Sequence, residues 1–521
     1  MFINALKETS NLTTSTNGAT MYSSTFNPLL DFNFKISSYR NGDRVSKVMK
    51  IQEDWRKVLE DTSISDEIKI KYLFYLRDAR EGIGERYTFR IAMLDTLING
   101  TKNQRTLVIK SLKYLSEFGR WDDLFHLHGV TAEANMEIES IVRNQWVEDL
   151  HNYKQNKPIS LLAKWLSSIN SHSIQTKTEA KKWCKILNLS EPAYRKSLSM
   201  LRSYLNIVER NMSSKEYEKI NYSEVPSKAA LLYKDAFKRN DTERYTKYLE
   251  DLKTNKNGVK VNASVTMPYE IVKKYRGCHL EDTLLEEAWK AIPCEDISDT
   301  LVIRDGSGSM TWNNIGNTGC KPIDFANSLA IFFAEHSKGE FKDKFITFSS
   351  RPQFVDLSNC NSLKEKIRLT NRHNDCSNTN LEATFDLILD TAIRHNLTQE
   401  DLPKNLLIVS DMEFDGATTS YRDVYTLMET IEQKFADHGY KLPRLIFWQI
   451  TSTNHVVFPQ IKGNCVLISG FSQNNYKMIM SGKLDPWLAL MDVLNSKRYD
   501  IIDKTIDSLE LTMSSEETTN A

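Results

Sequence analysis

The sequence predicts a multidomain protein in which an α-helical domain precedes an α/β domain with a parallel sheet. Before residue 300, apolar residues recur at helical spacing in successive segments, and strand-like alternation is nearly absent. After residue 300, short apolar runs alternate with amphipathic segments, as strands and helices do in a doubly wound sheet. With 521 residues, of which 40% are hydrophobic and 26% charged, the chain is too long for one core and has an ordinary globular composition.

The first part is expected to be a helical array. Helices are predicted at 68–80, 87–99, 106–118, 121–128, 158–169, 178–187, 195–211, 228–240 and 280–292. Because they have no sheet to cover, they must bury their apolar faces on one another, as in solenoid proteins. We expect residues 1–28, which are rich in Ser, Thr and Asn, to form an extended arm, and residues 29–295 to form the helical domain.

The second part is expected to be an α/β domain over residues 296–498, followed by an acidic tail over 499–521. Strands are predicted at 301–305, 343–350, 405–411, 444–450 and 463–470, and helices at 323–337, 381–396, 424–439 and 487–495. This alternation builds a parallel sheet wrapped by helices. The carboxyl ends of its strands meet at one edge, where ligands bind.

Oxygen-bearing side chains gather where two of these strands end. Asp305, Ser307 and Ser309 follow the first strand at alternate positions, and the two glycines between them are expected to allow backbone conformations closed to other residues. Asp411 follows a second buried strand, and Thr379 stands just ahead of an amphipathic helix. Carboxylate and hydroxyl oxygens are hard ligands, so the set predicts a divalent cation, Mg²⁺ first, with Mn²⁺ or Ca²⁺ as alternatives. A polar loop that holds no ion is the competing interpretation.

The set also resembles the metal-ion-dependent adhesion site of von Willebrand factor A domains. Further stretches resemble motifs of one family in that family's order: YLRDAREGIGER at 75–86, FGRWDDL at 118–124, LAKWL at 162–166, AYRKSLSMLRSYL at 193–205, VPSKAALLY at 225–233 and FWQITSTNHVVFPQIKGNCVLISGFS at 447–472. Over roughly residues 15–500 the chain resembles the TROVE/von Willebrand A proteins, relatives of the 60-kDa Ro autoantigen. The resemblance is strongest to an uncharacterised branch, a domain of unknown function found in viruses, bacteria and eukaryotes.

The resemblance implies a HEAT-like ring or horseshoe of helical repeats joined to a von Willebrand A domain. It also implies a ribonucleoprotein scaffold, because Ro proteins hold structured noncoding RNA on a basic outer surface and pass single-stranded ends through the ring. A cation bound by hydroxyls and one or two acids keeps an open coordination position. An acidic protein ligand, or a phosphate, is expected to complete that position.

The most basic part of the chain offers candidate RNA contacts. Residues 1–300 carry 46 Lys and Arg against 40 Asp and Glu, whereas residues 301–521 carry 22 against 28, so an anionic partner is expected on the first part. The most basic window is residues 151–200, and the candidate cations lie in it or just beyond it: Lys177, Lys181, Lys182, Lys185, Arg195, Lys196 and Arg202. A solvated helix face explains the lysines equally well. The interleaved Trp165, Trp183 and Tyr194 are expected to be core residues rather than stacking platforms for bases.

Cysteine usage and hydropathy indicate the compartment. Seven cysteines are scattered without a CxxC pair, which favours a reducing compartment over a disulfide framework or structural zinc. The sequence has no signal-like N-terminus and no run of about 18 apolar residues. We therefore expect a cytoplasmic protein with no membrane segment, and we expect it to be a monomer.

Enzymatic activity is not expected. The DGSGS stretch lacks the GxSxG spacing of a nucleophile elbow, and no histidine is placed by the sequence to act as a base. The stretch at 75–86 lacks the Lys-Ser/Thr ending of a phosphate-binding loop, so it is expected to be a helix-terminal turn held by ion pairs. The leading hypothesis is an RNA-binding scaffold with a cation-dependent docking site. A cation-dependent protein-interaction module without RNA function is the alternative.

Overall fold

The computed structural model describes residues 10–504 apart from short gaps. The gaps are at 41, 262, 264–265, 277–281, 295–296, 298, 313, 316–318, 349, 375, 417–425, 451–455, 457, 460–464, 470–474, 481–482 and 484. Most of the expected acidic tail, residues 505–521, lies outside the described residues, as do Cys278 and part of the 447–472 motif. The six cysteines among the described residues are all free thiols. Among the described helices, none combines the length and the hydrophobicity that crossing a membrane requires.

The chain folds into two compact units. The sheet unit comprises Met1–Asp61, Glu81–Ile83 and Lys260–Ser496, and the helical unit comprises Thr62–Arg80, Gly84–Val259 and Lys497–Ala521. These units differ from the ranges expected from the sequence, because the segment before residue 62 groups with the sheet and not with the helices. The physical reason is burial: Ala19, Met21 and Phe34 lie in the same hydrophobic core as the strands.

The sheet unit contains a six-stranded sheet in the order β5-β4-β3-β6-β7-β8. Its strands are β3 (Thr300–Asp305), β4 (Lys344–Phe348), β5 (Gln353–Asp356), β6 (Asn405–Ser410), β7 (Arg444–Gln449) and β8 (Cys465–Ser469). All neighbours pair in parallel except β4 and β5. The sheet is therefore mixed at one edge and not wholly parallel as expected. Strand order reverses between β3 and β6, the position where open α/β sheets bind ligands.

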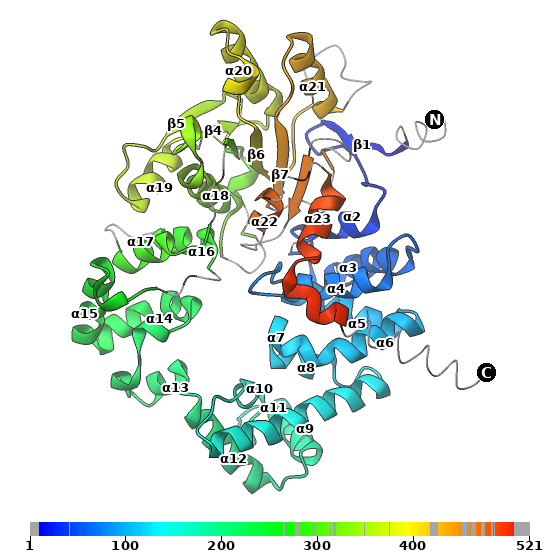
Figure 1. Ribbon diagram of the computed structural model, residues 1–521, viewed down its shortest axis with the longest axis vertical. Helices are drawn as coiled ribbons and strands as arrows, with labels where there is room; N and C mark the ends of the chain where they lie inside the picture. Colours follow the sequence, from blue (N-terminus) through cyan, green and yellow to red (C-terminus); the bar gives the residue numbers. More distant parts are fainter. Residues whose placement is uncertain are drawn as a thin grey trace. The chain divides into compact units, whose positions relative to one another are not determined.

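Helices cover both faces of this sheet (Figure 1). On one face, α20 (Leu381–Arg394) and α21 (Leu427–Asp437) contribute Phe385 and Phe435 to the core formed with β3, β6 and β7. On the other face, α18 (Pro322–His336) packs Phe325 and Phe333 against Trp448 of β7, with ring centroids 6.3 and 5.9 Å apart. The alternation of buried side chains along each strand thus supplies two apolar layers. This part is the α/β fold predicted from the sequence, with an added helix, α19 (Leu363–Arg372).

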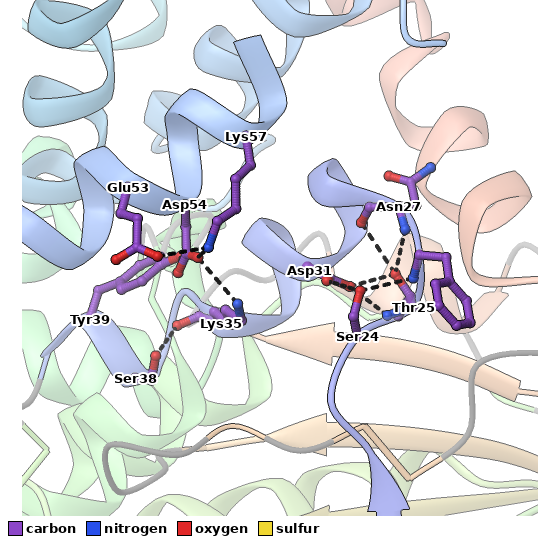
Figure 2. Close-up of polar contacts among 11 residues, drawn as sticks. Ser24, Thr25, Asn27, Asp31, Lys35, Ser38, Tyr39, Glu53, Asp54 and Lys57 are labelled. Atoms are coloured by element: carbon purple, nitrogen blue, oxygen red, sulfur yellow. Dashed lines mark hydrogen bonds and ion pairs between the residues drawn. The ribbon is translucent and has the colours of Figure 1, made fainter. Parts of the chain in front are cut away.

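The remaining helices of the sheet unit flank this arrangement. They are α2 (Pro28–Lys35), α3 (Arg44–Glu60), α16 (Pro268–Val272), α17 (Thr283–Lys290), α22 (Asn475–Met480) and α23 (Pro486–Leu494). Helix α2 packs on α3 and contacts β8. Between α2 and α3, Asp54 accepts bonds from Tyr39, Lys35 and Lys57, at 3.0, 3.3 and 3.3 Å (Figure 2).

The N-terminal segment is a hairpin and not the extended arm that was expected. Strands β1 (Leu12–Thr14) and β2 (Thr20–Tyr22) pair antiparallel. The base of the hairpin is tied to α2 by Asp31, whose carboxylate accepts bonds of 2.5 Å from the hydroxyls of Ser24 and Thr25 (Figure 2). The polar composition of residues 1–28 predicted an extended arm, but Ala19 and Met21 are fully buried.

The helical unit is built from helices that pack mainly on their neighbours in the chain. They are α4 (Asp66–Arg77), α5 (Arg86–Asn99), α6 (Lys102–Ser111), α7 (Leu115–Phe118), α8 (Trp121–Leu127), α9 (Ala132–Lys154), α10 (Leu162–Trp165), α11 (Ile174–Ile186), α12 (Glu191–Tyr204), α13 (Val208–Ser213), α14 (Ser227–Asn240) and α15 (Thr242–Lys253). A helical first part is therefore confirmed in its secondary structure.

Two of the sequence motifs meet inside the helical unit. Arg77 donates from Nε and Nη2 to one oxygen of Asp123, at 2.7 Å in each case, and Arg90 donates to the other oxygen at 2.8 Å. The next residue of the first motif, Asp78, accepts a bond of 3.0 Å from Arg498. Asp78 and Asp123 are completely buried. The expected helix-terminal turn held by ion pairs is thus confirmed.

Candidate cation site and basic helices

The ends of β3 and β6 bring two carboxylates together at the point where strand order reverses. Because β3 and β6 pair in parallel with Arg304 opposite Val409, Asp305 lies beside Ser410, the residue that precedes Asp411. The Ser410 hydroxyl donates a 2.6 Å hydrogen bond to Asp305 Oδ2. Sheet pairing therefore fixes the relative positions of these strand ends.

Two serine hydroxyls lie between the acids. The backbone N–H of Ser307 donates to Asp305 Oδ1 at 2.9 Å, and the hydroxyl oxygens of Ser307 and Ser309 are 3.0 Å apart. The Ser309 hydroxyl lowers the pKa of Asp411, against the effect of burial. The two hydroxyls thus extend the network of Asp305 toward Asp411. Ser307 is buried, whereas Ser309 is exposed, so the network opens to solvent at Ser309.

Thr379 lies at the same edge but on a different branch of the network. Its hydroxyl donates to Asp415 Oδ1 at 3.0 Å and accepts a 2.7 Å bond from the side-chain amide of Asn17. A hydroxyl has two lone pairs, so one remains for a cation. The segment leading to Thr379 runs along the DGSGS loop, since Gly308 N–H donates to the Ser377 carbonyl at 3.1 Å. The structure therefore places all five predicted residues at one edge, with Thr379 bonded to none of the other four.

The electrostatics of the two acids favour a cation between them. Asp305 is completely buried and Asp411 is 5% exposed. Burial, and next the Asp305 carboxylate, raises the pKa of Asp411. Burial also raises the pKa of Asp305, against hydrogen bonds from Ser307 and Ser410. Two buried carboxylates that disfavour each other's ionised form are a poor arrangement by themselves and a good one around a positive charge.

The chemical type of these ligand atoms fits a hard divalent cation. Two carboxylates and three hydroxyls supply only oxygen, as Mg²⁺, Mn²⁺ and Ca²⁺ require. Among the described residues, no three His, Cys, Asp or Glu side chains gather as a metal cluster. The residues that would hold the ion are thus two acids supplemented by hydroxyls, Asp305, Ser307, Ser309, Thr379 and Asp411.

Gly308 acts through the space it leaves, whereas the sequence had predicted a special backbone conformation for it. Gly308 has a φ of −63°, which any residue adopts. A Cβ atom there would lie 3.2 Å from the Cys376 carbonyl oxygen, tighter than an ordinary contact. Glycine at 308 thus lets the loop approach the segment that leads to Thr379.

The neighbouring Arg304 is buried and belongs to the fold. Its guanidinium donates to the His373 carbonyl at 3.0 Å and to Asn374, at the carboxyl end of α19. Cations near a helix C-terminus are favoured by its unpaired carbonyls. The unusual arginine at this strand position therefore leaves the strand end fully buried.

The basic helices present some of the predicted cations to solvent. On α11, Lys177, Lys181 and Lys185 recur every four residues and are all exposed, which forms one cationic stripe. On α12, Arg195 and Lys196 are exposed as well.

The other predicted residues of this region are engaged within the fold. Lys182 is half-buried, with its ammonium 5.4 Å from the ring centroid of Trp183. Arg202 donates to the Ala163 and Leu166 carbonyls, at 2.8 and 2.6 Å, and so serves the fold. Trp183 and Tyr194 are completely buried. Their assignment to the core is therefore confirmed.

Two family models match this chain. Both are described only as domains of unknown function: DUF2828 over residues 146–299 and DUF7788 over residues 299–498. The uncharacterized protein L728 of Acanthamoeba polyphaga mimivirus is 28% identical over 542 residues, covering 94% of this chain and 90% of its own. Among solved structures, the crystal structure of the Deinococcus radiodurans RO (RSR) protein aligns with 86% of this chain and 97% of its own, at 13% identity and a TM-score of 0.44.

Sequence reasoning missed two residues of the candidate site. Ser410 was treated as part of a buried strand, although a serine at a strand end beside an acid was a usable signal. Asn17 was assigned to an extended arm, although the Asn17-Gly18 dipeptide between short Thr-rich segments is a hairpin signal. Its partner across the sheet edge, Glu413, is 396 positions away. No local sequence pattern can predict a hydrogen bond between residues so far apart in the chain.

Proposed function

We propose that this protein is a non-catalytic scaffold that docks an acidic group through a divalent cation at the β3–β6 edge and binds RNA on the exposed cations of α11 and α12. The convergence of Asp305 and Asp411 at the strand-order reversal carries the docking half. The cationic stripe, together with the sequence resemblance to TROVE proteins, supports the RNA half. A HEAT-like ring, a von Willebrand A assignment, a monomeric state and a cytoplasmic location remain predictions.

The docking half follows from the number and kind of ligands. Two carboxylates and three hydroxyls supply five oxygens, so an ion that takes six ligands keeps one position for an incoming anionic oxygen. The site opens at Ser309, and Trp312 close by in the chain is 77% exposed. An exposed tryptophan three residues after Ser309 offers apolar contact area to a partner. A partner segment with a carboxylate next to an apolar side chain fits this surface.

The RNA half depends on accessible charge and not on stacking. Lys177, Lys181, Lys185, Arg195 and Lys196 are exposed on adjoining helices. Clustered cations bind phosphates and release counterions, which makes affinity fall with salt. The buried Trp183 and Tyr194 offer no platform for bases, so the proposed contact is to the backbone of structured RNA.

Mn²⁺ titration monitored by electron paramagnetic resonance tests the docking half. Wild-type protein is expected to bind one Mn²⁺ that Mg²⁺ displaces. Asp411→Asn should lose that binding, because it removes a ligand charge while keeping the side chain's size. Glu432→Gln, an exposed acid on α21, is the matched control and should bind normally. Equal binding by Asp411→Asn and wild type would overturn the docking half.

Filter binding of a structured RNA over a series of salt concentrations tests the RNA half. Replacing Lys177, Lys181 and Lys185 by Ala should weaken binding and lower the slope of log affinity against log salt by up to about 3, one unit for each lost phosphate contact. The control replaces three other exposed lysines of the helical unit, Lys102, Lys110 and Lys113, and should leave the slope unchanged. If wild-type protein shows no RNA affinity at low salt, the interaction module without RNA function is the better description.

A further inference from the structure

The turn of the N-terminal hairpin is bonded to the loop that carries Asp411. This turn is Ser15–Ala19, and the loop comprises residues 411–415. The Asn17 amide donates 2.7 Å bonds to the Glu413 carbonyl and to the Thr379 hydroxyl. The Ser15 hydroxyl donates to the Phe414 carbonyl at 2.6 Å, and the Thr16 N–H donates to the Glu413 carboxylate at 2.9 Å. One short turn therefore binds two consecutive carbonyls of this loop.

The loop needs such support because its backbone is strained. Met412 has a φ of 65°, a left-handed conformation that side chains other than glycine disfavour. Holding a residue there costs on the order of 1–3 kcal/mol, so the conformation persists only where its surroundings fix it. Met412 lies directly between Asp411 and Glu413. Relaxation of this residue would therefore turn the Asp411 carboxylate away from Ser309 and Asp305.

The hairpin is anchored well enough to supply that restraint. Ala19 and Met21 are buried in the core of the sheet unit. At its base, the Asn11 amide donates to the Ser24 carbonyl at 2.7 Å, and Ser24 in turn bonds to Asp31 of α2 (Figure 2). The core and the base of the hairpin thus fix the position of the turn that contacts the loop.

The turn supports the site without covering it. Among the described residues, its hydrogen bonds go to Thr379 and residues 413–415, and none goes to Asp305, Ser307, Ser309 or Asp411. Ser309 stays exposed. A turn that blocked docking would lie over Ser309, whereas this one bonds to Thr379 and to residues 413–415.

We propose that the Ser15–Ala19 turn is a clamp for the Asp411 loop and that Asn17 is a positioning residue of the cation site. The cation in this proposal comes from the proposed function above, whereas the clamp itself acts in the absence of metal. Because the clamp orders a ligand, turn docking and cation binding favour each other. By linkage, a bound cation must stabilise the docked turn to the same degree that the turn strengthens cation binding.

Hydrogen exchange on the full chain tests the clamp without metal. The Asp415 N–H, which donates to the Thr379 carbonyl at 3.0 Å, is the reporter. Asn17→Ala and Ser15→Ala should each speed its exchange by about 10-fold in EDTA. Thr14→Ala changes an exposed residue of β1 next to the turn; it is the matched control and should leave the exchange rate unchanged. Unchanged exchange at Asp415 in both variants would overturn the clamp.

Mn²⁺ affinity then tests the coupling. Residues that orient metal ligands typically contribute 10–100-fold to affinity, so Asn17→Ala is expected to weaken Mn²⁺ binding by about 10-fold or more. Mg²⁺ should slow exchange in the wild-type turn. A gain in affinity in Asn17→Ala would show that the turn competes with the cation and would overturn the coupling. If the wild-type protein binds no cation, the proposed docking function fails, and exchange at Asp415 in EDTA still decides whether the clamp exists.

Discussion

Ser410 donates a 2.6 Å hydrogen bond to Asp305, a residue 105 positions earlier in the chain. The bond joins the ends of two central strands, so the orientation of the first acid depends on the register of the sheet and not on the mobility of a loop. The Asp305 carboxylate is thereby fixed by the pairing of β3 with β6, whereas Asp411 lies one residue beyond β6, in the loop that follows it.

Ser410→Ala is expected to weaken cation binding by about 10–100-fold, because it removes the group that orients Asp305. It should also destabilise the protein by roughly 1–3 kcal/mol, since a buried carboxylate oxygen loses its partner. Ser337 is the matched control. Its buried hydroxyl donates a 2.8 Å bond to the carbonyl of Thr300, which lies at the opposite end of β3 from Asp305. Calorimetric Mg²⁺ titration should show normal affinity for Ser337→Ala and reduced affinity for Ser410→Ala.

Asp411→Asn should stabilise the protein when no cation is present. The substitution removes one of two buried carboxylates whose charges oppose each other, and we expect a gain of roughly 1 kcal/mol or more in EDTA. Thermal melts in EDTA and in Mg²⁺ measure both effects. Wild-type protein should gain stability on addition of Mg²⁺, and Asp411→Asn should not. A variant that melts below wild type in EDTA would contradict this electrostatic description.

Asp123→Ala should be among the most destabilising substitutions in the helical unit. It would leave Arg77, which is 3% exposed, without its carboxylate, and breaking a buried ion pair from one side costs about 3–5 kcal/mol. Asp122→Ala is the matched control, because Asp122 is 24% exposed and pairs with Arg90 at 2.8 Å near solvent. It should cost about 1 kcal/mol or less. Urea unfolding followed by circular dichroism compares the two.

Arg202→Met should lower stability without changing the salt dependence of RNA binding. Its guanidinium holds three acceptors, the Ala163 and Leu166 carbonyls and the Ser168 hydroxyl. We expect a loss of roughly 1–3 kcal/mol from the unpaired carbonyls. A fall of about 1 in the salt slope for RNA would instead assign Arg202 to the RNA surface.

The sequence predicted the features that depend on local pattern. The apolar runs before Asp305 and Asp411 became neighbouring parallel strands, and Trp183 became core as its helical spacing indicated. Features that depend on distant partners were not predictable in the same way. The N-terminal segment is polar by composition, and only its burial against Phe414 and Phe458 makes it a hairpin with a fixed place. For Gly308 the sequence predicted a conformational role, whereas the structure shows a steric one.

The path of the chain between the two units has a consequence for synthesis on the ribosome. The sheet unit begins within Met1–Asp61 and is completed only by Lys260–Ser496, with nearly 200 residues of the helical unit made in between. At about 5–20 residues per second, the buried face of the hairpin and α2 must wait on the order of 20–90 s for the strands that cover it. Nascent chains therefore expose Met21 and Phe34 for that interval, which makes this N-terminal segment the place where chaperone capture during translation is expected.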